Sequence, residues 1–379
     1  MLVRRILPLL LIALMLGALF VAALAAASAL PVQDLAQYWA AAHLVTRNPY
    51  SFELTTNFER SAGVLSAAAI PLVIKNPPWA FLFIFPLALL SYKVAFAIWA
   101  VMSIIVVAGC ARVVWGFYTP TPSLAPAFLS LLFGPTVVLL MLGQFTVLVL
   151  LGITFFLVMV ERRRDWLAGL ALLPVLGKPH VAFLFLLAIL LWVIYARRWV
   201  ILLSGALALI AASVIALAIN PQIFTQFIGR TTLVVHETES YPNLGGAIYV
   251  ASGFHIMALL PQLFGAVWLI VYWRNHRSTW RWKTDGMIVL LVSVATSYYS
   301  YPYDEILMLP ALIGAFASGS RRIFLVGFMV TNMGYALYIS NFAGYFSFGY
   351  MFLWWTATVW LITFALSRNQ RIIPTTPQV

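Results

Sequence analysis

Charged residues are scarce in this chain of 379 residues: Asp, Glu, Lys and Arg together make up 8% of it, and only ten residues are acidic. Ordinary soluble domains carry roughly 25% charged residues. Hydrophobic residues reach 64%, so the chain must spend most of its length in lipid. We therefore expect an all-α polytopic membrane protein, which excludes the ordinary soluble enzymes and binding domains.

Several motifs are also absent. The single cysteine, Cys110, lies in an apolar run, so neither an intramolecular disulfide nor a cysteine metal cluster can form. The chain has no Walker phosphate loop, no Gly-x-Ser-x-Gly elbow, no Gly-x-Gly-x-x-Gly after a strand and no His-Glu-x-x-His. ATP-driven transport, serine hydrolysis and zinc proteolysis therefore have no support in the sequence.

The net charge of +12 does not indicate nucleic-acid binding. Most Lys and Arg residues stand in short clusters between apolar runs, where the positive-inside rule explains them. We expect a lipid bilayer around the protein and no nucleic-acid partner.

About twelve membrane spans are predicted. The first runs from Ile6 to about Leu30; a signal peptide is the alternative, but the run exceeds the 7–15 residues usual for that core. Residues 78–91 are too short for a span and are interpreted as re-entrant or interfacial. The other spans are expected near 94–115, 123–141, 145–160, 166–177, 180–195, 199–219, 254–272, 286–300, 303–318, 323–340 and 350–366.

The basic loops orient these spans. If the clusters at 161–165, 197–198, 274–283 and 321–322 and the tail with Arg368 and Arg371 are cytoplasmic, the alternation is consistent from residue 143 to the end. Two long hydrophilic segments, about 31–77 and 220–252, then face outward, and long loops of this kind usually carry function. Most acidic residues fall on the same outer side: Asp34, Glu53, Glu59, Glu237, Glu239, Asp304 and Glu305.

Asp34 stands where the first span meets water, just before a helix expected over Leu35 to Val45. Two interpretations are open. Aspartate is favoured at a helix N-cap, so the residue could have a purely structural role. A carboxylate at this interface could equally act as a general base toward a substrate hydroxyl.

Lys178 and His180 interrupt an otherwise apolar stretch on the outer side. The structural interpretation is a short loop broken by Pro179, with the lysine reaching the headgroups. The functional interpretation is that Lys178 supplies a point charge for a phosphate and His180 a second donor.

Other polar positions on the outer side are weaker candidates. Gln144 follows Gly143 in what could be a simple polar turn. Asp304 and Glu305 could cap the following helix or, beside the neighbouring tyrosines, bind sugar hydroxyls. The run from His236 to Glu239 matches no recognised zinc pattern, so a metal site is not expected there.

The order of four segments resembles glycosyltransferase family 87 of the polytopic GT-C superfamily. The first runs from Asp34 to Tyr50 and the second from Asn76 to Leu87; Gly143-Gln144 and the stretch from Ala168 to Pro179 follow. The chain has Asn76 where the family usually has tyrosine before Pro-Pro. The resemblance implies a GT-C type fold as a single transmembrane domain over 1–379, with re-entrant or juxtamembrane helices in the first outer loop.

The resemblance also implies a reaction. The enzyme would move a sugar, mannose or arabinofuranose, from a polyprenyl-phosphate donor to a glycolipid or glycan acceptor. It would do so on the periplasmic or extracellular side of the cytoplasmic membrane, with inversion and with Asp34 as general base. We expect Lys178, His180 and Arg230 to bind the donor phosphate, and no cofactor or metal. Substrate-binding candidates are Tyr38, Asn76, Gln144, His236, Asp304 and Glu305.

Two other functional classes stay open. A lipid or solute transporter also fits about twelve spans, but the two halves show no matching interrupted helices, and the ionisable residues gather at one face rather than in mid-membrane. The second alternative is an accessory subunit whose outer acids only keep it soluble.

Overall fold

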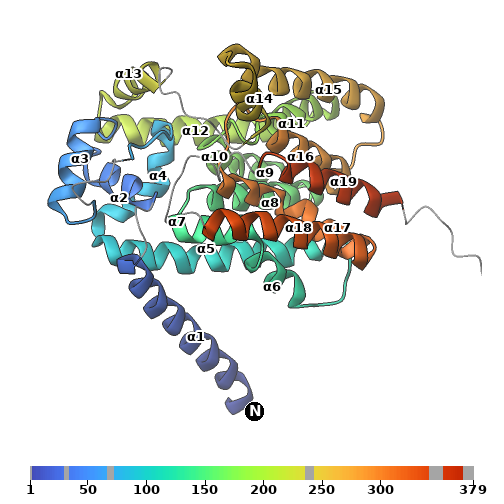
Figure 1. Ribbon diagram of the computed structural model, residues 1–379, viewed down its shortest axis with the longest axis horizontal. Helices are drawn as coiled ribbons and strands as arrows, with labels where there is room; N and C mark the ends of the chain where they lie inside the picture. Colours follow the sequence, from blue (N-terminus) through green and yellow to red (C-terminus); the bar gives the residue numbers. More distant parts are fainter. Residues whose placement is uncertain (1, 30–33, 66–71, 235–242, 341–352, 370–379) are drawn as a thin grey trace, which may run out of the picture. The chain divides into compact units, whose positions relative to one another are not determined.

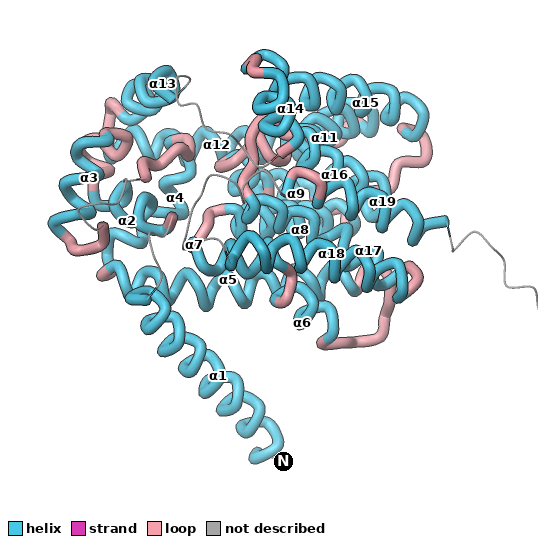
Figure 2. The backbone as a smooth tube through the Cα atoms, viewed as in Figure 1, coloured by secondary structure: helices cyan, strands magenta, loops and turns pink. Residues whose placement is uncertain are grey.

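A computed structural model describes residues 2–29, 34–65, 72–234, 243–340 and 353–369. These residues form helices joined by loops and turns, and they contain no strand (Figures 1 and 2). The expectation of an all-α protein is confirmed for this part of the chain. The sequence explains it, because a backbone in lipid must satisfy its own hydrogen bonds and a helix does so locally.

The chain divides into two compact units. The first comprises residues 1–106, 140–144 and 210–237. Its whole elements are α1 (Leu2–Ala29), α2 (Leu35–His43), α3 (Phe52–Ser61), η1 (Pro78–Ala80), α4 (Phe81–Ile84), η2 (Phe85–Leu89) and α13 (Ile223–Val234).

The second unit comprises residues 107–139, 145–209 and 238–379. Three helices begin in one unit and end in the other: α5 (Tyr92–Trp115), α7 (Gly134–Leu142) and α12 (Val200–Ile219). The expectation of a single domain therefore stays a prediction. The elements wholly in the second unit are α6 (Ala125–Leu131), α8 (Thr146–Glu161), α9 (Asp165–Leu170), α10 (Leu172–Leu176), α11 (Phe183–Ala196), α14 (Leu244–Ser252), η3 (His255–Leu259), α15 (Leu260–His276), η4 (Trp282–Gly286), α16 (Met287–Thr296), η5 (Pro302–Met308), α17 (Leu309–Ser318), α18 (Arg321–Ser340) and α19 (Thr356–Asn369).

Four helical stretches of the described chain are long and apolar enough to cross a membrane: α5, α12, α18 and the continuous run His255–His276. The pair α6 and α7, bent by 61°, would make a fifth. The remaining apolar helices are shorter, so a total of about twelve spans stays a prediction. The length and composition of these helices are compatible with a membrane protein.

The segment expected to be re-entrant or interfacial is helical but broken. Residues 78–89 form η1, α4 and η2 in succession, with Pro86 at the start of the last piece. At about 1.5 Å per residue, twelve helical residues reach roughly 18 Å, well short of the ~30 Å hydrocarbon core. The break at the proline is expected, because proline cannot donate a helix hydrogen bond.

The helix expected over Leu35 to Val45 is present as α2, and α3 follows it in the same segment. Ser51 caps α3, its hydroxyl accepting a hydrogen bond from the Leu54 amide at 3.3 Å. The loop is tied down within the first unit by Tyr50, whose hydroxyl donates to the Asn76 carbonyl at 2.9 Å. Asn220 donates to the Val45 carbonyl at 2.9 Å.

Candidate functional site

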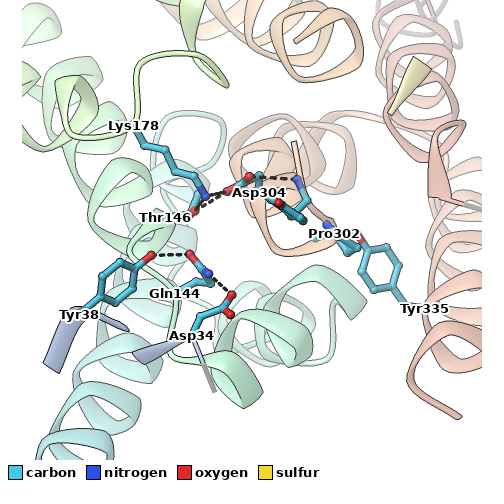
Figure 3. Close-up of polar contacts among 9 residues, drawn as sticks. Asp34, Tyr38, Gln144, Thr146, Lys178, Pro302, Asp304 and Tyr335 are labelled. Atoms are coloured by element: carbon cyan, nitrogen blue, oxygen red, sulfur yellow. Dashed lines mark hydrogen bonds and ion pairs between the residues drawn. The ribbon is translucent and has the colours of Figure 1, made fainter. Parts of the chain in front are cut away.

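Asp34 is the first member of a hydrogen-bonded chain within the first unit (Figure 3). The Gln144 amide nitrogen donates to the Asp34 carboxylate, and the Gln144 carbonyl accepts from the Tyr38 hydroxyl at 2.9 Å. Both contacts fit one orientation of the amide group, so its donor and acceptor ends are defined. Three residues that were separate candidates in the sequence are therefore one cluster, buried at 9%, 3% and 1% exposure for Asp34, Tyr38 and Gln144.

The structural interpretation of Asp34 is not borne out by its own geometry. The residue stands at the N-cap position of α2, but its backbone is already helical (φ −64°, ψ −21°), and its side chain makes no capping hydrogen bond. An aspartate that caps a helix usually has an extended backbone and accepts from the second or third amide. The carboxylate faces Gln144 instead.

Gly143 explains why Gln144 can reach Asp34. Its φ is +70°, in the left-handed region that residues with a side chain rarely adopt. A Cβ atom built on Gly143 would lie 2.8 Å from the Cβ of Leu35, the first residue of α2. The turn after α7 therefore requires glycine at position 143 for two reasons: its backbone conformation and its close approach to α2.

A second cluster lies within the second unit and is built around Lys178 (Figure 3). The ammonium nitrogen is 2.5 Å from an Asp304 oxygen and 3.2 Å from the Thr146 hydroxyl, which itself donates to the same oxygen at 2.5 Å. Asp304 is fully buried and Lys178 is 8% exposed. Lys178 also lies 4.6 Å from the centre of the Tyr303 ring.

This pairing changes both interpretations made from sequence. Lys178 does not snorkel freely, because it is buried against a carboxylate. Asp304 combines two roles: its other oxygen accepts from the Tyr301 amide at 3.1 Å, which caps η5. The lysine keeps three N–H donors, and the contacts described use two of them.

His180 is neutral rather than a second cation. It is stacked on Tyr299, with ring centres 3.8 Å apart, and its Nε2 is buried without a hydrogen-bond partner. Burial, with the Lys178 charge as the second cause, holds the pKa of His180 well below its usual value. At neutral pH it could offer a phosphate one neutral N–H donor, but no charge.

Glu305 is held inside the second unit. One of its oxygens is 2.7 Å from the Tyr335 hydroxyl, and the other accepts a short hydrogen bond from Thr356. The Tyr335 hydroxyl also lies 2.7 Å from the Pro302 carbonyl. Both carboxyl oxygens are thus engaged with the protein, which is a structural arrangement joining η5 to α18 and α19.

Glu59 is an acid that the sequence placed on the outer side without singling it out. It is 1% exposed on α3, and neither carboxyl oxygen has a hydrogen-bond partner. Burial raises its pKa from 4.5 to about 7. Thr55, one turn earlier on the same helix, is likewise 1% exposed with its hydroxyl unpartnered.

Comparison with known proteins gives the chemical context. The model of glycosyltransferase family 87 matches residues 75–297, more than half of the chain. The chain belongs to glycosyltransferase family 87. No curated protein matches it. As a family 87 protein it is a membrane glycosyltransferase, which uses a sugar donor and an acceptor.

The match to family 87 includes some site residues and not others. Gln144, Lys178 and His180 lie inside it, as do Asn76 and Arg230. Asp34 and Tyr38 precede it, as do Thr55 and Glu59. Asp304 and Glu305 follow it.

The remaining candidates are dispersed. Arg230 lies on α13 in the first unit, so the expected phosphate group of Lys178, His180 and Arg230 does not form within one unit. Asn76 is 7% exposed beside Tyr50. His236 lies outside the described residues. Among the residues that the structure describes, no three or more His, Cys, Asp or Glu side chains form a group that could hold a metal ion.

Two features of the site escaped sequence reasoning. The pairing of Lys178 with Asp304 joins residues 126 positions apart, and no local pattern encodes it. The burial of Glu59 had no local signal, since Glu53 on the same helix is exposed and the sequence does not distinguish the two acids.

Proposed function

We propose that the protein transfers a sugar from a polyprenyl-phosphate donor to a lipid or glycan acceptor on the outer face of the cytoplasmic membrane, with Asp34 as the general base. The observation that carries this proposal is the orientation of Asp34. Its carboxylate leaves the helix cap unused and is held by Gln144, which Tyr38 holds in turn.

The chemistry is an inverting displacement. The Asp34 carboxylate takes the proton of an acceptor hydroxyl, and the oxygen attacks the anomeric carbon of the donor sugar. The bond from that carbon to the polyprenyl phosphate breaks, and the phosphate leaves with the electron pair. A base needs a fixed position within hydrogen-bond reach of the proton it removes. Gln144 and Tyr38 supply that positioning.

Charge develops on the leaving phosphate and needs a preorganised partner. Lys178 is our proposal for this role: it is buried, its position is set by Asp304 and Thr146, and it retains a donor for a phosphate oxygen. His180 would add a neutral hydrogen bond. Phosphate binding by Arg230 stays a prediction, as does sugar binding by Asn76, His236 and the already engaged Asp304 and Glu305.

Asp34→Asn tests the base. The substitution keeps the shape of the side chain and removes its capacity to take the proton. With labelled polyprenyl-phosphate-mannose or polyprenyl-phosphate-arabinofuranose and purified protein in vesicles, transfer should fall by at least a hundredfold. Glu53→Gln, which removes an exposed acid of the same outer loop, is the matched control and should keep wild-type activity.

A loss of less than tenfold in Asp34→Asn would remove the base assignment. The same assay separates the other functional classes. Labelled lipid that crosses the vesicle membrane without transfer indicates a transporter, and neither transfer nor crossing indicates an accessory subunit.

A further inference from the structure

Two polar side chains on one face of α3 have no hydrogen-bond partner among the residues that the structure describes. The hydroxyl of Thr55 and both carboxyl oxygens of Glu59 are buried without a hydrogen bond. The residues are four positions apart on a helix, so their side chains lie one above the other. The face presents three adjacent polar atoms that need partners.

Other buried carboxyls in the described part of the chain have hydrogen-bond partners. Asp304 and Glu305 are 0% and 5% exposed, yet each carboxylate accepts hydrogen bonds from neighbouring side chains. Native proteins pair the large majority of their buried polar atoms, because an unpaired one forfeits its hydration without compensation. The missing partners at Thr55 and Glu59 are therefore most simply supplied by a bound molecule.

An aromatic cluster where α3 packs against α2 indicates the chemistry of that molecule. The neighbouring Phe58 ring lies 5.1 Å from Trp39 and 5.1 Å from His43, and Trp39 lies 5.7 Å from Tyr92. Ring faces with a few polar groups among them are the usual lining of a ligand site. Flat aromatic surface packs against the C–H faces of a sugar, and a carboxylate accepts from its hydroxyls.

Glu59 lies on α3, which packs against α2, and Asp34 stands at the start of α2. Both carboxyl groups belong to the first unit, and both influence the Tyr92 hydroxyl electrostatically. A sugar in contact with Glu59 would thus be the one whose hydroxyl Asp34 deprotonates. In the reaction that molecule is the acceptor.

We propose that Thr55 and Glu59 form a subsite that binds hydroxyl groups of the acceptor sugar, beside the hydroxyl that attacks the donor. This inference rests on the proposed function of Asp34.

The kinetic test uses Glu59→Gln and Thr55→Val, with Glu53→Gln as the control on the same helix. The probes are methyl α-mannoside and methyl α-arabinofuranoside as acceptors, with the matching polyprenyl-phosphate sugar as donor. Loss of a hydrogen bond to a charged group corresponds to about a ten- to hundredfold rise in the acceptor KM. The donor KM, kcat and the control should stay within threefold of wild type.

A binding measurement separates this inference from the proposed function. In the Asp34→Asn background, the probe glycoside should raise the melting temperature in proportion to its concentration, and Glu59→Gln should abolish the rise. Equal stabilisation with and without Glu59, or no stabilisation by either probe, overturns the subsite. A change in donor KM alone overturns its assignment to the acceptor. If Asp34→Asn remains active, the assignment of Asp34 as the base is wrong. The binding measurement then still decides whether the subsite exists.

Discussion

The ion pair between Lys178 and Asp304 gives the sharpest test of the structure. Removing one member of a buried pair leaves an uncompensated charge and costs about 3–5 kcal/mol. Lys178→Met would leave the fully buried Asp304 with the Thr146 hydroxyl and the Tyr301 amide. Asp304→Asn would leave a buried ammonium beside a neutral amide. Each single variant should therefore lose several degrees of melting temperature.

The double variant Lys178→Met with Asp304→Asn should be more stable than the sum of the two single losses predicts. Replacing both members of a buried pair by uncharged groups of similar volume is often close to neutral. We expect a coupling of at least about 2 kcal/mol in the double-mutant cycle. The assay is thermal unfolding of the purified protein in detergent, read for all four members of the cycle.

Additive losses of stability in the two single variants would refute the pairing.

The same four proteins also test the role of Lys178 in the reaction. If the lysine binds the donor phosphate, the double variant regains stability but transfers sugar at least tenfold more slowly than wild type, with a raised donor KM. If activity returns together with stability, the pair is structural and the phosphate assignment is wrong.

Three further predictions concern positions that the fold constrains. Gly143→Ala should cost about 1–3 kcal/mol and lower transfer, because its positive φ and the 2.8 Å approach to Leu35 leave no room for a methyl group; unchanged melting and activity would contradict this. Gly169→Leu should unfold or severely destabilise the protein in a detergent melting assay, because a Cβ there would lie 1.8 Å from the Ser204 hydroxyl; the matched Gly229→Leu, with open space around it, should be tolerated. Glu59→Gln should match wild type in melting temperature near pH 4.5 and exceed it at pH 8, and parallel pH curves for the two proteins would refute this. Burial raises the pKa of Glu59 in the wild type, so the folded state holds the proton more tightly than the unfolded chain does. The free energy of unfolding of the wild type therefore falls by about 3 kcal/mol between pH 4.5 and about 7.

The local elements were largely readable from sequence. The helix expected over Leu35 to Val45 is present as α2, and the proline-bounded segment after Pro77 is broken into short helical pieces. Apolar length predicted α5, α12 and α18 within a few residues. Such features follow from propensity, proline chemistry and hydrophobic length, which act between near neighbours in the chain.

The break in the predicted span 123–141 was not anticipated. The stretch is mostly apolar, but it forms α6 and α7 at 61° to each other, with Gly134-Pro135 at the start of α7. Asn332 accounts for part of the stability of this break: its amide donates to the Leu132 carbonyl at 3.0 Å, and its oxygen accepts from the Gly134 amide at 2.8 Å. A residue almost two hundred positions away thus satisfies the exposed helix ends, which a window of local sequence cannot include.

Composition alone determined that this is a helical membrane protein, because so few charged residues cannot cover the water-exposed surface that a soluble chain of this length would have. The order of short motifs then indicated family 87, and the family match confirmed it. Only the tertiary structure decided which partners the rare acids contact. It turned Asp34 from a helix cap toward Gln144, paired Asp304 with Lys178, and buried Glu59 without a partner. The reason is physical: the state of a carboxylate depends on burial and on partners brought in from distant parts of the chain, and neither is encoded in the residues beside it.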